Sequence, residues 1–221
     1  MATTPANHHE ANRAFYDRIS EAYDWIADSN ERAARMVGVE LLKLQPGERI
    51  LEVGFGTGNE VLDLAKLVGP KGKVCGIDIS AGMLAVAQRK VTKEAMQTPV
   101  ELRVGDARKL PYDAGAFDAV YSSFTLELFP EDDSPLVLSE IRRVLRKDGR
   151  LAAVSMEIVK PGQAPSVLER TYIWMHRHFP HIVDCRPIDL PSILTKARFH
   201  VVKQTRMEIW TMPVAAVLAA S

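Results

Sequence analysis

A glycine-rich turn and one later carboxylate stand out in this 221-residue chain, because their types and spacing could bind a ligand. Gly54, Gly56 and Gly58 follow a short apolar run, and Glu52 comes just before them. Glycines allow a sharp turn and a close approach of a ligand, and a helix that begins there offers unpaired N–H groups. Asp78 ends the next apolar run, where its carboxylate can accept both hydroxyls of a ribose. These residues predict a site for a nucleoside-containing cofactor at the carboxyl edge of a sheet.

The glycine spacing favours one kind of nucleoside cofactor. A dinucleotide fingerprint is G-x-G-x-x-G, whereas here Gly58 comes one position early and Asn59 follows it. Glu52 would lie poorly beside two phosphates but well beside the ammonium group of an amino acid. We therefore expect an adenosine joined to methionine through a positive sulfonium, with an NAD(P)-dependent oxidoreductase as the alternative.

The elements that must position these residues alternate between strands and helices. The apolar and helical patterns predict strands at 49–53, 73–78, 100–104, 117–121 and 150–156, with helices at 59–68, 81–93 and 136–145. Such alternation implies parallel strands joined by right-handed crossovers. The last third predicts helices at 166–179 and 188–197, then strands at 199–210 and 213–220. The short link between those two strands requires antiparallel pairing. We expect an α/β fold whose seven-stranded, mostly parallel sheet has helices on both faces and ends in a C-terminal antiparallel hairpin.

Composition and charge exclude several classes of protein. Lys plus Arg and Asp plus Glu are both 28, and a formal net charge of zero argues against a nucleic-acid partner. Cys75 and Cys185 are too few for a disulfide framework, so we expect a cytoplasmic protein with reduced thiols. The sequence shows no signal peptide and no membrane-spanning run. Residues 142–150 carry a basic run, interpreted as a solvated helix end, with peripheral contact to anionic lipid as the alternative.

Four ordered motifs show a resemblance to a known family. They are LEVGFGTG at 51–58, VGPKGKVCGIDIS at 68–80, GDARKLPYDAGAFDAVYSSFTL at 105–126 and RRVLRKDGRL at 142–151. The chain resembles the class I S-adenosylmethionine-dependent methyltransferases, within the ubiquinone/menaquinone C-methyltransferase-like (methyltransferase type 11) group. The resemblance implies a Rossmann-like sheet, S-adenosyl-L-methionine as cofactor, and methyl transfer to a small-molecule or lipid acceptor. Quinone-like C- or O-methylation and phospholipid N-methylation stay open, as does a non-catalytic protein that binds the cofactor.

The resemblance also implies a cofactor-binding role for individual residues. Those expected around the methionyl and ribose portion are Glu52, Gly54, Gly56, Gly58, Asp78, Ser122 and Ser123. Those expected around the adenine are Ile79, Met83, Asp106, whose carboxylate would accept from the amino group, and Ala107. Tyr16 and Tyr23 match an amino-terminal helix that closes over the cofactor. Residues 1–45 would form this helical cap, with predicted helices at 12–28 and 31–44. Residues 46–221 would form the cofactor-binding domain, with a substrate lid at about 157–190.

The expected chemistry asks little of side chains. Aligning an acceptor with an activated methyl group can supply several kcal/mol, within the roughly 7–11 kcal/mol ceiling for proximity effects. A base is needed only if the acceptor must lose a proton, and the candidates are Glu127, Tyr172, His176 and His178. The histidines do not have the spacing of a structural zinc site, so we expect no metal.

One departure from the family bears on the acceptor. Glu127-Leu128 stands where quinone C-methyltransferases of this group carry an Arg-Asn pair. A phospholipid amine or another small nucleophile is therefore a competing acceptor. Arg186, within the predicted lid, could contact an anionic acceptor.

Overall fold

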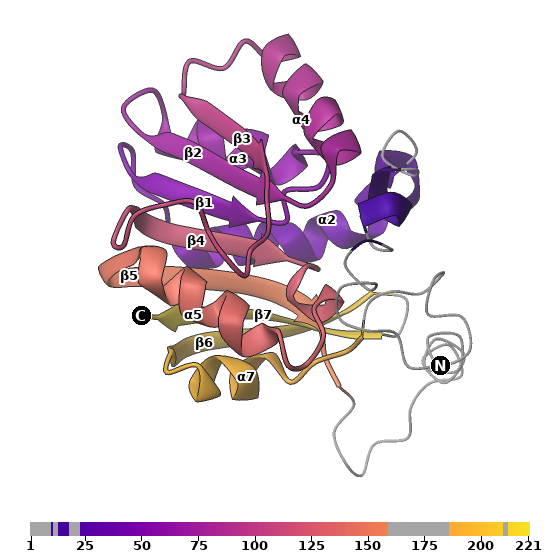
Figure 1. Cartoon of the computed structure of the whole chain (residues 1–221), viewed down its shortest axis with the longest axis vertical. Coiled ribbons are helices and arrows are strands. Elements are labelled where there is room, and N and C mark those ends of the chain that lie inside the picture. The colour runs from indigo at the N-terminus through magenta and orange to yellow at the C-terminus, as the bar shows by residue number, and fades with distance from the viewer. Residues whose placement is uncertain (1–9, 11–12, 18–22, 159–185, 210–211) are drawn as a thin grey trace.

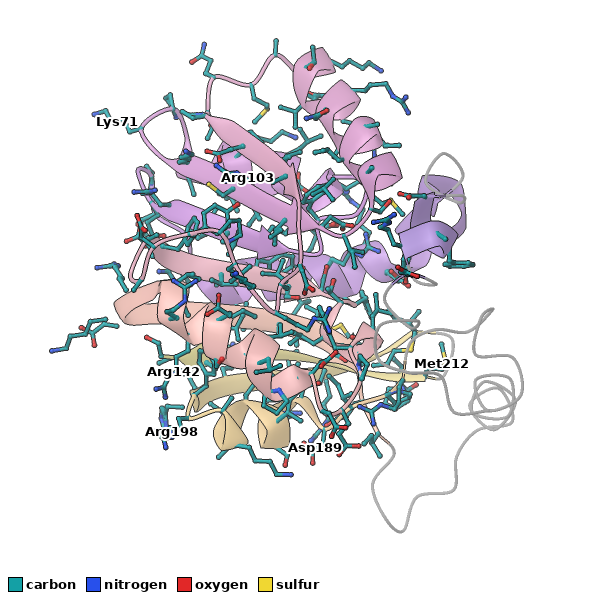
Figure 2. The ribbon with its side chains drawn as sticks, in the orientation of Figure 1. Lys71, Arg103, Arg142, Asp189, Arg198 and Met212 are labelled. Atoms are coloured by element: carbon teal, nitrogen blue, oxygen red, sulfur yellow. The ribbon has the colours of Figure 1, made fainter. Side chains whose placement is uncertain are left out.

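The computed structural model describes residues 10, 13–17, 23–158, 186–209 and 212–221, with side chains for all of these except 23–30. The predicted helix at 166–179 lies outside the described residues, as does most of the predicted lid. Charged side chains such as Lys71, Arg142 and Arg198 project from the periphery of the molecule (Figure 2).

One seven-stranded sheet forms the centre of the molecule (Figure 1). Its strands are β1 (Arg49–Val53), β2 (Lys73–Asp78), β3 (Val100–Val104), β4 (Phe117–Ser123), β5 (Leu145–Met156), β6 (His200–Ile209) and β7 (Met212–Ala220). They lie in the order β3-β2-β1-β4-β5-β7-β6. The first five pair in parallel, and β7 pairs antiparallel with both β5 and β6. The predicted α/β fold with a C-terminal antiparallel hairpin is thus confirmed.

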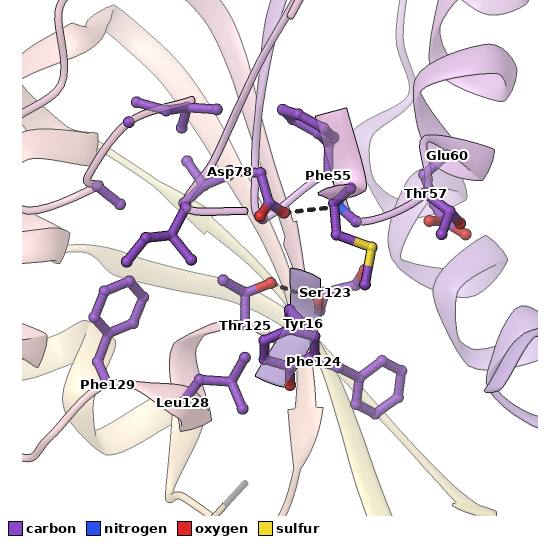
Figure 3. A pocket seen from close by; sticks show the side chains of 18 of the residues that line it. Tyr16, Phe55, Thr57, Glu60, Asp78, Ser123, Phe124, Thr125, Leu128 and Phe129 are labelled. Carbon is purple, nitrogen blue, oxygen red and sulfur yellow. Dashed lines mark hydrogen bonds between the residues drawn. The ribbon is translucent and has the colours of Figure 1, made fainter. Parts of the chain in front are cut away.

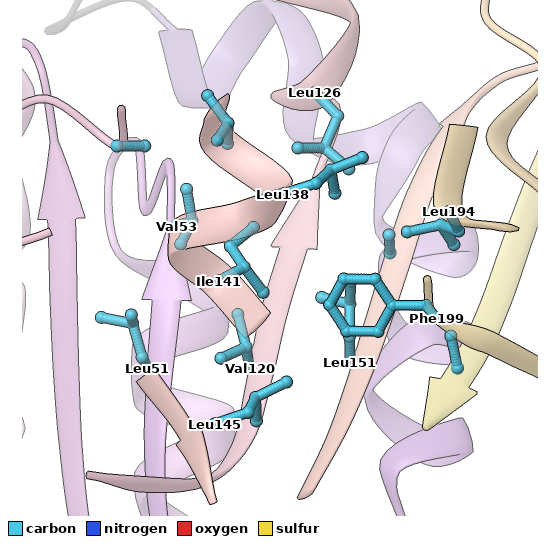
Figure 4. Close-up of a cluster of buried hydrophobic side chains, with 14 of the residues drawn as sticks. Leu51, Val53, Val120, Leu126, Leu138, Ile141, Leu145, Leu151, Leu194 and Phe199 are labelled. Atoms are coloured by element: carbon cyan, nitrogen blue, oxygen red, sulfur yellow. The ribbon is translucent and has the colours of Figure 1, made fainter. Parts of the chain in front are cut away.

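Helices cover both faces of this sheet because the buried strand residues alternate between two clusters. The described helices are α2 (Tyr23–Leu42), α3 (Asn59–Val68), α4 (Ala81–Lys93), α5 (Ser134–Val144) and α7 (Leu190–Lys196). On one face Leu51 and Val120 pack with side chains of α5 and α7, including Ile141 and Leu194 (Figure 4). On the other face the adjacent residues of the same strands pack with α2, α3 and Ala87 of α4.

The amino-terminal helices differ from the prediction. A break was expected near residues 28–31, yet α2 runs without interruption over Tyr23–Leu42. Asp28, Ser29 and Asn30 each disfavour a helix by only a few tenths of a kcal/mol, about 0.7 at most. Packing of α2 against β5 and β7 outweighs that cost, and Ala34, Val39 and other residues of this helix are fully buried. The second half of α2 is therefore part of the core rather than a separate cap.

The end of the α5 helix also differs from the prediction. The helix was expected to continue to Leu145 and to end at Asp148-Gly149. Instead it stops at Val144, and β5 begins at once because Leu145 pairs with Phe117 of β4. The pairing register then shifts, because Phe117 pairs with Leu145 but Ala119 pairs with Arg150. The extra residues of β5 include Asp148, where the backbone turns with a φ of 61°. The core of the strand, from Arg150 onward, follows the prediction.

The strand order creates a place for a ligand. The chain runs outward from β1 through β2 to β3, then returns to place β4 on the other side of β1. At such a switch point the loops after neighbouring parallel strands separate and leave a crevice at the carboxyl ends of the strands.

Candidate cofactor site

A cavity lies at this switch point and is partly open to solvent (Figure 3); its empty space together with that open region is about 920 Å³. Its walls come from the loops that follow β1, β2, β3 and β4, with additions from α2 and the amino-terminal segment. The lining residues are Tyr16, Arg35, Val53, Gly54, Phe55, Gly56, Thr57, Glu60, Ile77, Asp78, Ile79, Met83, Gly105, Asp106, Ala107, Ser123, Phe124, Thr125, Leu128 and Phe129.

Asp78 holds the centre of the site together. Its Oδ2 accepts a hydrogen bond from the Gly56 amide at 2.9 Å, and its Oδ1 accepts one from the Ser80 amide at 2.9 Å. These backbone donors connect the end of β2 to the glycine turn after β1 and to the start of α4. Burial raises the pKa of Asp78 above its ordinary value, although the backbone donors act in the opposite direction. A carboxylate fixed at the cavity wall is suited to accept hydroxyl donors from a ligand.

Two glycines of the turn are required for different reasons. Gly54 has a φ of 76°, and a Cβ there would collide with the side chain of Thr125. Gly56 has a φ of 51°, but a Cβ there would meet no protein atom within 4 Å. A side chain at Gly56, which lines the cavity, would therefore take up space that the protein leaves to a ligand.

One end of the cavity is acidic. Glu60, in the first turn of α3, and Arg35, from α2, both line it, and Arg35 Nη1 lies 3.5 Å from each carboxylate oxygen of Glu60. Glu52 is buried nearby, and burial followed by the charge of Glu60 raises its pKa well above the ordinary range. Among the described residues, neither Glu52 oxygen has a hydrogen-bond partner. The raised pKa favours the neutral form of Glu52, whereas Glu60 shares the Arg35 guanidinium with Glu31, whose Oε2 lies 2.5 Å from Arg35 Nη2. Two carboxylates beside one guanidinium would suit a ligand that carries an ammonium group.

The amino-terminal segment reaches the site through two consecutive residues. Tyr16 lines the cavity, and Asp17 Oδ1 accepts hydrogen bonds from Ser80 Oγ at 2.5 Å and from the Gly82 amide at 2.9 Å. The hydrogen bond from the Ser80 hydroxyl, and after it the one from the Gly82 amide, lowers the pKa of Asp17. Residues 13–17 are thereby attached to the beginning of α4, beside the cavity.

Most of the predicted cofactor-binding residues line this cavity. They are Tyr16, Gly54, Gly56, Asp78, Ile79, Met83, Asp106, Ala107 and Ser123. Tyr23 lies in α2, but its side chain is outside the described part of the chain. Their contacts with a cofactor stay a prediction.

Three predicted residues lie behind the cavity wall. Ser122 turns away from it, because its hydroxyl donates to the Val53 carbonyl at 3.0 Å. A Cβ at Gly58 would lie 2.7 Å from Ala87 Cβ, so Gly58 serves the close packing of α3 against α4. Glu52 is 1% exposed beneath the turn and is also absent from the lining residues.

Sequence reasoning missed several lining residues. Glu60 carried a detectable signal, since it is an acidic residue in the first turn of a helix that follows a glycine turn. Arg35 carried none, because it comes from a helix that reaches the site only through tertiary packing. The turn after β4 brings Phe124, Thr125 and Phe129 to the cavity in the same way.

The candidate bases remain predictions. Glu127 is 1% exposed in the short helix η1 (Leu126–Leu128), between lining residues but not among them. Its Oε1 accepts from the Met156 amide at 3.3 Å, and burial raises its pKa to about 7. Tyr172, His176 and His178 lie outside the described residues.

The described part of the chain offers neither a metal site nor a membrane-spanning helix. Its His, Cys, Asp and Glu side chains form no group of three that could hold a metal ion. None of its helices is both long and apolar enough to cross a bilayer.

In the basic run, Arg143, Arg146 and Arg150 form ion pairs with Glu140, Asp118 and Glu48, respectively. Their cationic side chains therefore contribute to the fold around the ends of β4 and β5.

Comparison with known proteins identifies the family. Residues 50–149 match the family model described as a methyltransferase domain. These residues therefore belong to the methyltransferase domain family, and the match supports a class I S-adenosylmethionine-dependent methyltransferase. The methyltransferase domain contains the glycine turn, Asp78, Asp106 and the loop after β4. The match does not favour the dinucleotide-dependent oxidoreductase that was kept as an alternative.

The chain has relatives of known name. It is 36% identical over 140 residues to a demethylmenaquinone methyltransferase of Lactobacillus johnsonii, which covers 62% of this chain and 57% of that protein. It is 32% identical over 151 residues to a 2-phytyl-1,4-naphtoquinone methyltransferase of Synechococcus elongatus, covering 66% of this chain and 64% of that protein. The chain thus spans about three-fifths of the length of these relatives. A crystal structure of an S-adenosylmethionine-dependent methyltransferase from Aquifex aeolicus superposes with a TM-score of 0.67 and 24% identity, covering 90% of this chain and 97% of that chain. That likeness concerns the fold.

Proposed function

We propose that the protein transfers a methyl group from S-adenosylmethionine to a quinone-like small molecule. The observation that carries this proposal is the cavity at the carboxyl ends of β1 and β2, where the Asp78 carboxylate and the open face of Gly56 meet. The family match supports S-adenosylmethionine as the ligand of that cavity.

The residues present fit this cofactor in three respects. Asp78 would accept the ribose hydroxyls, and Gly56 leaves space for the ligand to lie against the backbone. Glu60, with Glu52 behind it, would favour the ammonium group of the methionine portion, while Arg35 would favour its carboxylate. Ile79 and other apolar residues would pack on the adenine. When bound, S-adenosylmethionine supplies a methyl carbon already activated by a sulfonium, so alignment is the main task left to the protein.

The proposed acceptor is a quinone-like ring rather than a phospholipid amine. The names of the relatives, demethylmenaquinone and 2-phytyl-1,4-naphtoquinone methyltransferase, support this choice over the alternative suggested by Glu127-Leu128. The activated methyl group is an electrophile, so the reacting ring carbon must be electron-rich, as it is in the reduced, hydroquinone form. The aromatic rings of Tyr16, Phe124 and Phe129 on the cavity wall would suit a flat apolar acceptor.

We further propose that the protein acts in the cytoplasm and takes an apolar acceptor from a membrane surface by peripheral contact. An acceptor with a long hydrocarbon chain would partition into lipid. The neutral net charge supports a small-molecule partner over a nucleic acid.

The proposal is tested in two steps on the full chain. Calorimetric titration with S-adenosylhomocysteine measures cofactor binding, and methyl-labelled S-adenosylmethionine is then offered with reduced demethylated naphthoquinones, phospholipid amines and simple phenols. We expect saturable binding and label on the naphthoquinone ring. The variant Asp113→Ala, an exposed carboxylate outside the cavity lining, should behave as the unaltered protein does.

Each other outcome has a distinct meaning. Absence of binding at millimolar S-adenosylhomocysteine would contradict the cofactor assignment. Label only on an amine would contradict the quinone-like acceptor. Binding without turnover on any acceptor would favour a non-catalytic protein that retains the cofactor pocket.

A further inference from the structure

Arg108 lies outside the cavity wall but is hydrogen-bonded to a residue of it. Its guanidinium donates to the carboxylate of Asp106, with Nε 2.9 Å and Nη2 2.7 Å from Oδ2. Its backbone amide donates to Asp106 Oδ1 at 2.9 Å. The Asp106 side chain raises the pKa of Arg108, so the cation is retained at any physiological pH. Asp106, which lines the cavity, is thus held in one orientation by side-chain and backbone donors together.

The same guanidinium also reaches a second loop. Arg108 Nη1 donates to Asp133 Oδ2 at 3.0 Å, and the Asp133 side chain is only 13% exposed. Asp133 is fixed in turn, because its amide donates to the Pro130 carbonyl at 3.0 Å and its carbonyl accepts from the first turn of α5. The segment that leads into this turn carries Leu128 and Phe129, which line the cavity.

Two walls of the cavity are therefore joined by one side chain that is not itself part of the lining. One wall is the loop after β3, with Asp106 and Ala107, and the other is the loop after β4, with Leu128 and Phe129. A lysine could supply the charge of Arg108, but a guanidinium is a planar fork that can engage two carboxylates at once. The two contacts of Arg108, with Asp106 and with Asp133, therefore require the shape of a guanidinium and not only its positive charge.

We propose that Arg108 is a positioning residue that sets the purine selectivity of this cavity, by orienting the Asp106 carboxylate and holding the two walls at a fixed separation. This inference rests on the proposed function, which places an adenosyl group here. An oriented carboxylate accepts a hydrogen bond from the 6-amino group of adenine. A 6-oxopurine presents an oxygen at the same position, and two acceptors that face each other are unfavourable.

The test compares two ligands whose purines differ in the group at position 6 and in the proton that N1 carries only in the 6-oxo form. S-adenosylhomocysteine and S-inosylhomocysteine are titrated calorimetrically into the full chain and into Arg108→Lys. We expect the unaltered protein to prefer the adenosyl ligand by roughly 10- to 100-fold, the range set by one hydrogen bond to a charged group. In Arg108→Lys that preference should fall to about 3-fold or less, mainly through weaker adenosyl binding, because a single ammonium cannot fix the carboxylate.

The chain offers a matched control. Arg103 on β3 pairs with Glu101, two residues earlier, just as Arg108 pairs with Asp106, but neither Arg103 nor Glu101 lines the cavity. Arg103→Lys should keep the full preference for the adenosyl ligand. Asp133→Asn provides a second, milder variant, which retains Asp106 and Arg108 but weakens the link to the other wall. It should lose part of the preference, about 2- to 5-fold.

The outcomes separate this inference from the function on which it rests. Equal losses of affinity for both ligands in Arg108→Lys, or an unchanged preference, would overturn the positioning role and leave the proposed function intact. If the unaltered protein bound neither ligand, both would be overturned. If Arg108→Lys did not fold, the result for Asp133→Asn would decide, and an unchanged preference in that variant would count against the inference.

Discussion

Two carboxylates near the ends of neighbouring parts of the sheet have opposite surroundings. Asp78, at the end of β2, accepts hydrogen bonds from the backbone amides of Gly56 and Ser80 and faces a cavity. Glu157, just after β5, accepts from Arg206 at 2.7 and 2.9 Å and from the Gln204 side chain at 3.1 Å. Glu157 is buried and Asp78 is partly buried, but only Glu157 has a guanidinium that neutralises it.

The difference separates a ligand-binding half of the sheet from a structural half. The Glu157–Arg206 pair joins the residue after β5 to β6, so this carboxylate has its cationic partner within the protein. In the other half, Glu52 and Asp78 have raised pKa values because burial is only partly compensated by the protein. Uncompensated burial of this kind costs stability, and it is tolerated where a ligand supplies the missing partners.

The largest effect is expected at the centre of the ligand-binding half. Asp78→Ala removes the acceptor for two ligand hydroxyls, and hydrogen bonds to a charged group contribute about 1.5–3 kcal/mol each. We expect the affinity for S-adenosylhomocysteine to fall by roughly 1,000-fold in calorimetry. Asp113→Ala serves as the control. If Asp78→Ala lowered the affinity by less than about 5-fold, Asp78 would not be the ligand-binding carboxylate that sets it apart from Glu157.

Glu127 tests whether a buried carboxyl without a cation partner lowers the stability of the fold when it ionises, as the contrast between Asp78 and Glu157 predicts. Its pKa of about 7 in the folded protein lies above the ordinary value of 4.5, so the folded state binds the extra proton between these values. The stabilisation is fully present below pH 4.5 and is lost as the pH rises through 7. The free energy of unfolding should therefore fall by about 2–3 kcal/mol between pH 5 and pH 8 because of this group.

Denaturant unfolding at several pH values measures this effect. Glu127→Gln keeps the shape of the side chain and cannot ionise, so the fall with pH should become shallower by the same amount. Asp113→Asn should leave the slope unchanged. An identical slope in Glu127→Gln and the unaltered protein would show that Glu127 is ionised in the folded state at pH 7.

Gly56 tests whether the open space beside Asp78 belongs to a ligand. Gly56→Ala places a Cβ where no protein atom lies within 4 Å, at a strain of roughly 1–2 kcal/mol for a positive φ. We expect S-adenosylhomocysteine binding to weaken by about 30-fold, because the added Cβ occupies ligand space, whereas the strain is present with and without the ligand and lowers stability instead. Gly115, with a φ of 69°, lies outside the cavity lining, so Gly115→Ala should lower thermal stability without weakening binding. Equal binding by both variants would contradict the assignment.

The smallest effect is expected in the structural half. Arg206→Met leaves the Glu157 carboxylate buried with only its Gln204 contact among the hydrogen bonds described above. The Arg206 side chain is half exposed, so solvent screens the pair and the loss of stability should be only about 1 kcal/mol. Affinity for S-adenosylhomocysteine should stay within about 2-fold of the unaltered protein. A larger loss of affinity would show that the structural half of the sheet also contributes to ligand binding.

Local signals explain what could be predicted. The strand at 49–53, the glycine turn and Asp78 were found because apolar runs, glycines and a carboxylate at a strand end are contiguous features. The resemblance implied a role for Ser122 and Ser123 together, but only Ser123 lines the cavity, because adjacent residues of a strand point to opposite sides and the pleat decides which one faces it. The break predicted inside α2 failed because packing outweighed weak local preferences.

The sequence by itself determined the order of strands and helices, the turn at 54–58 and the carboxylate at 78, since each depends on residues close together in the chain. Only the tertiary structure decided which charges share an environment. Arg35 approaches Glu60, Arg108 connects Asp106 with Asp133, and Arg206 neutralises Glu157. Coulombic and hydrogen-bond energies depend on distance in space and on exclusion of water, and neither quantity can be read along a chain.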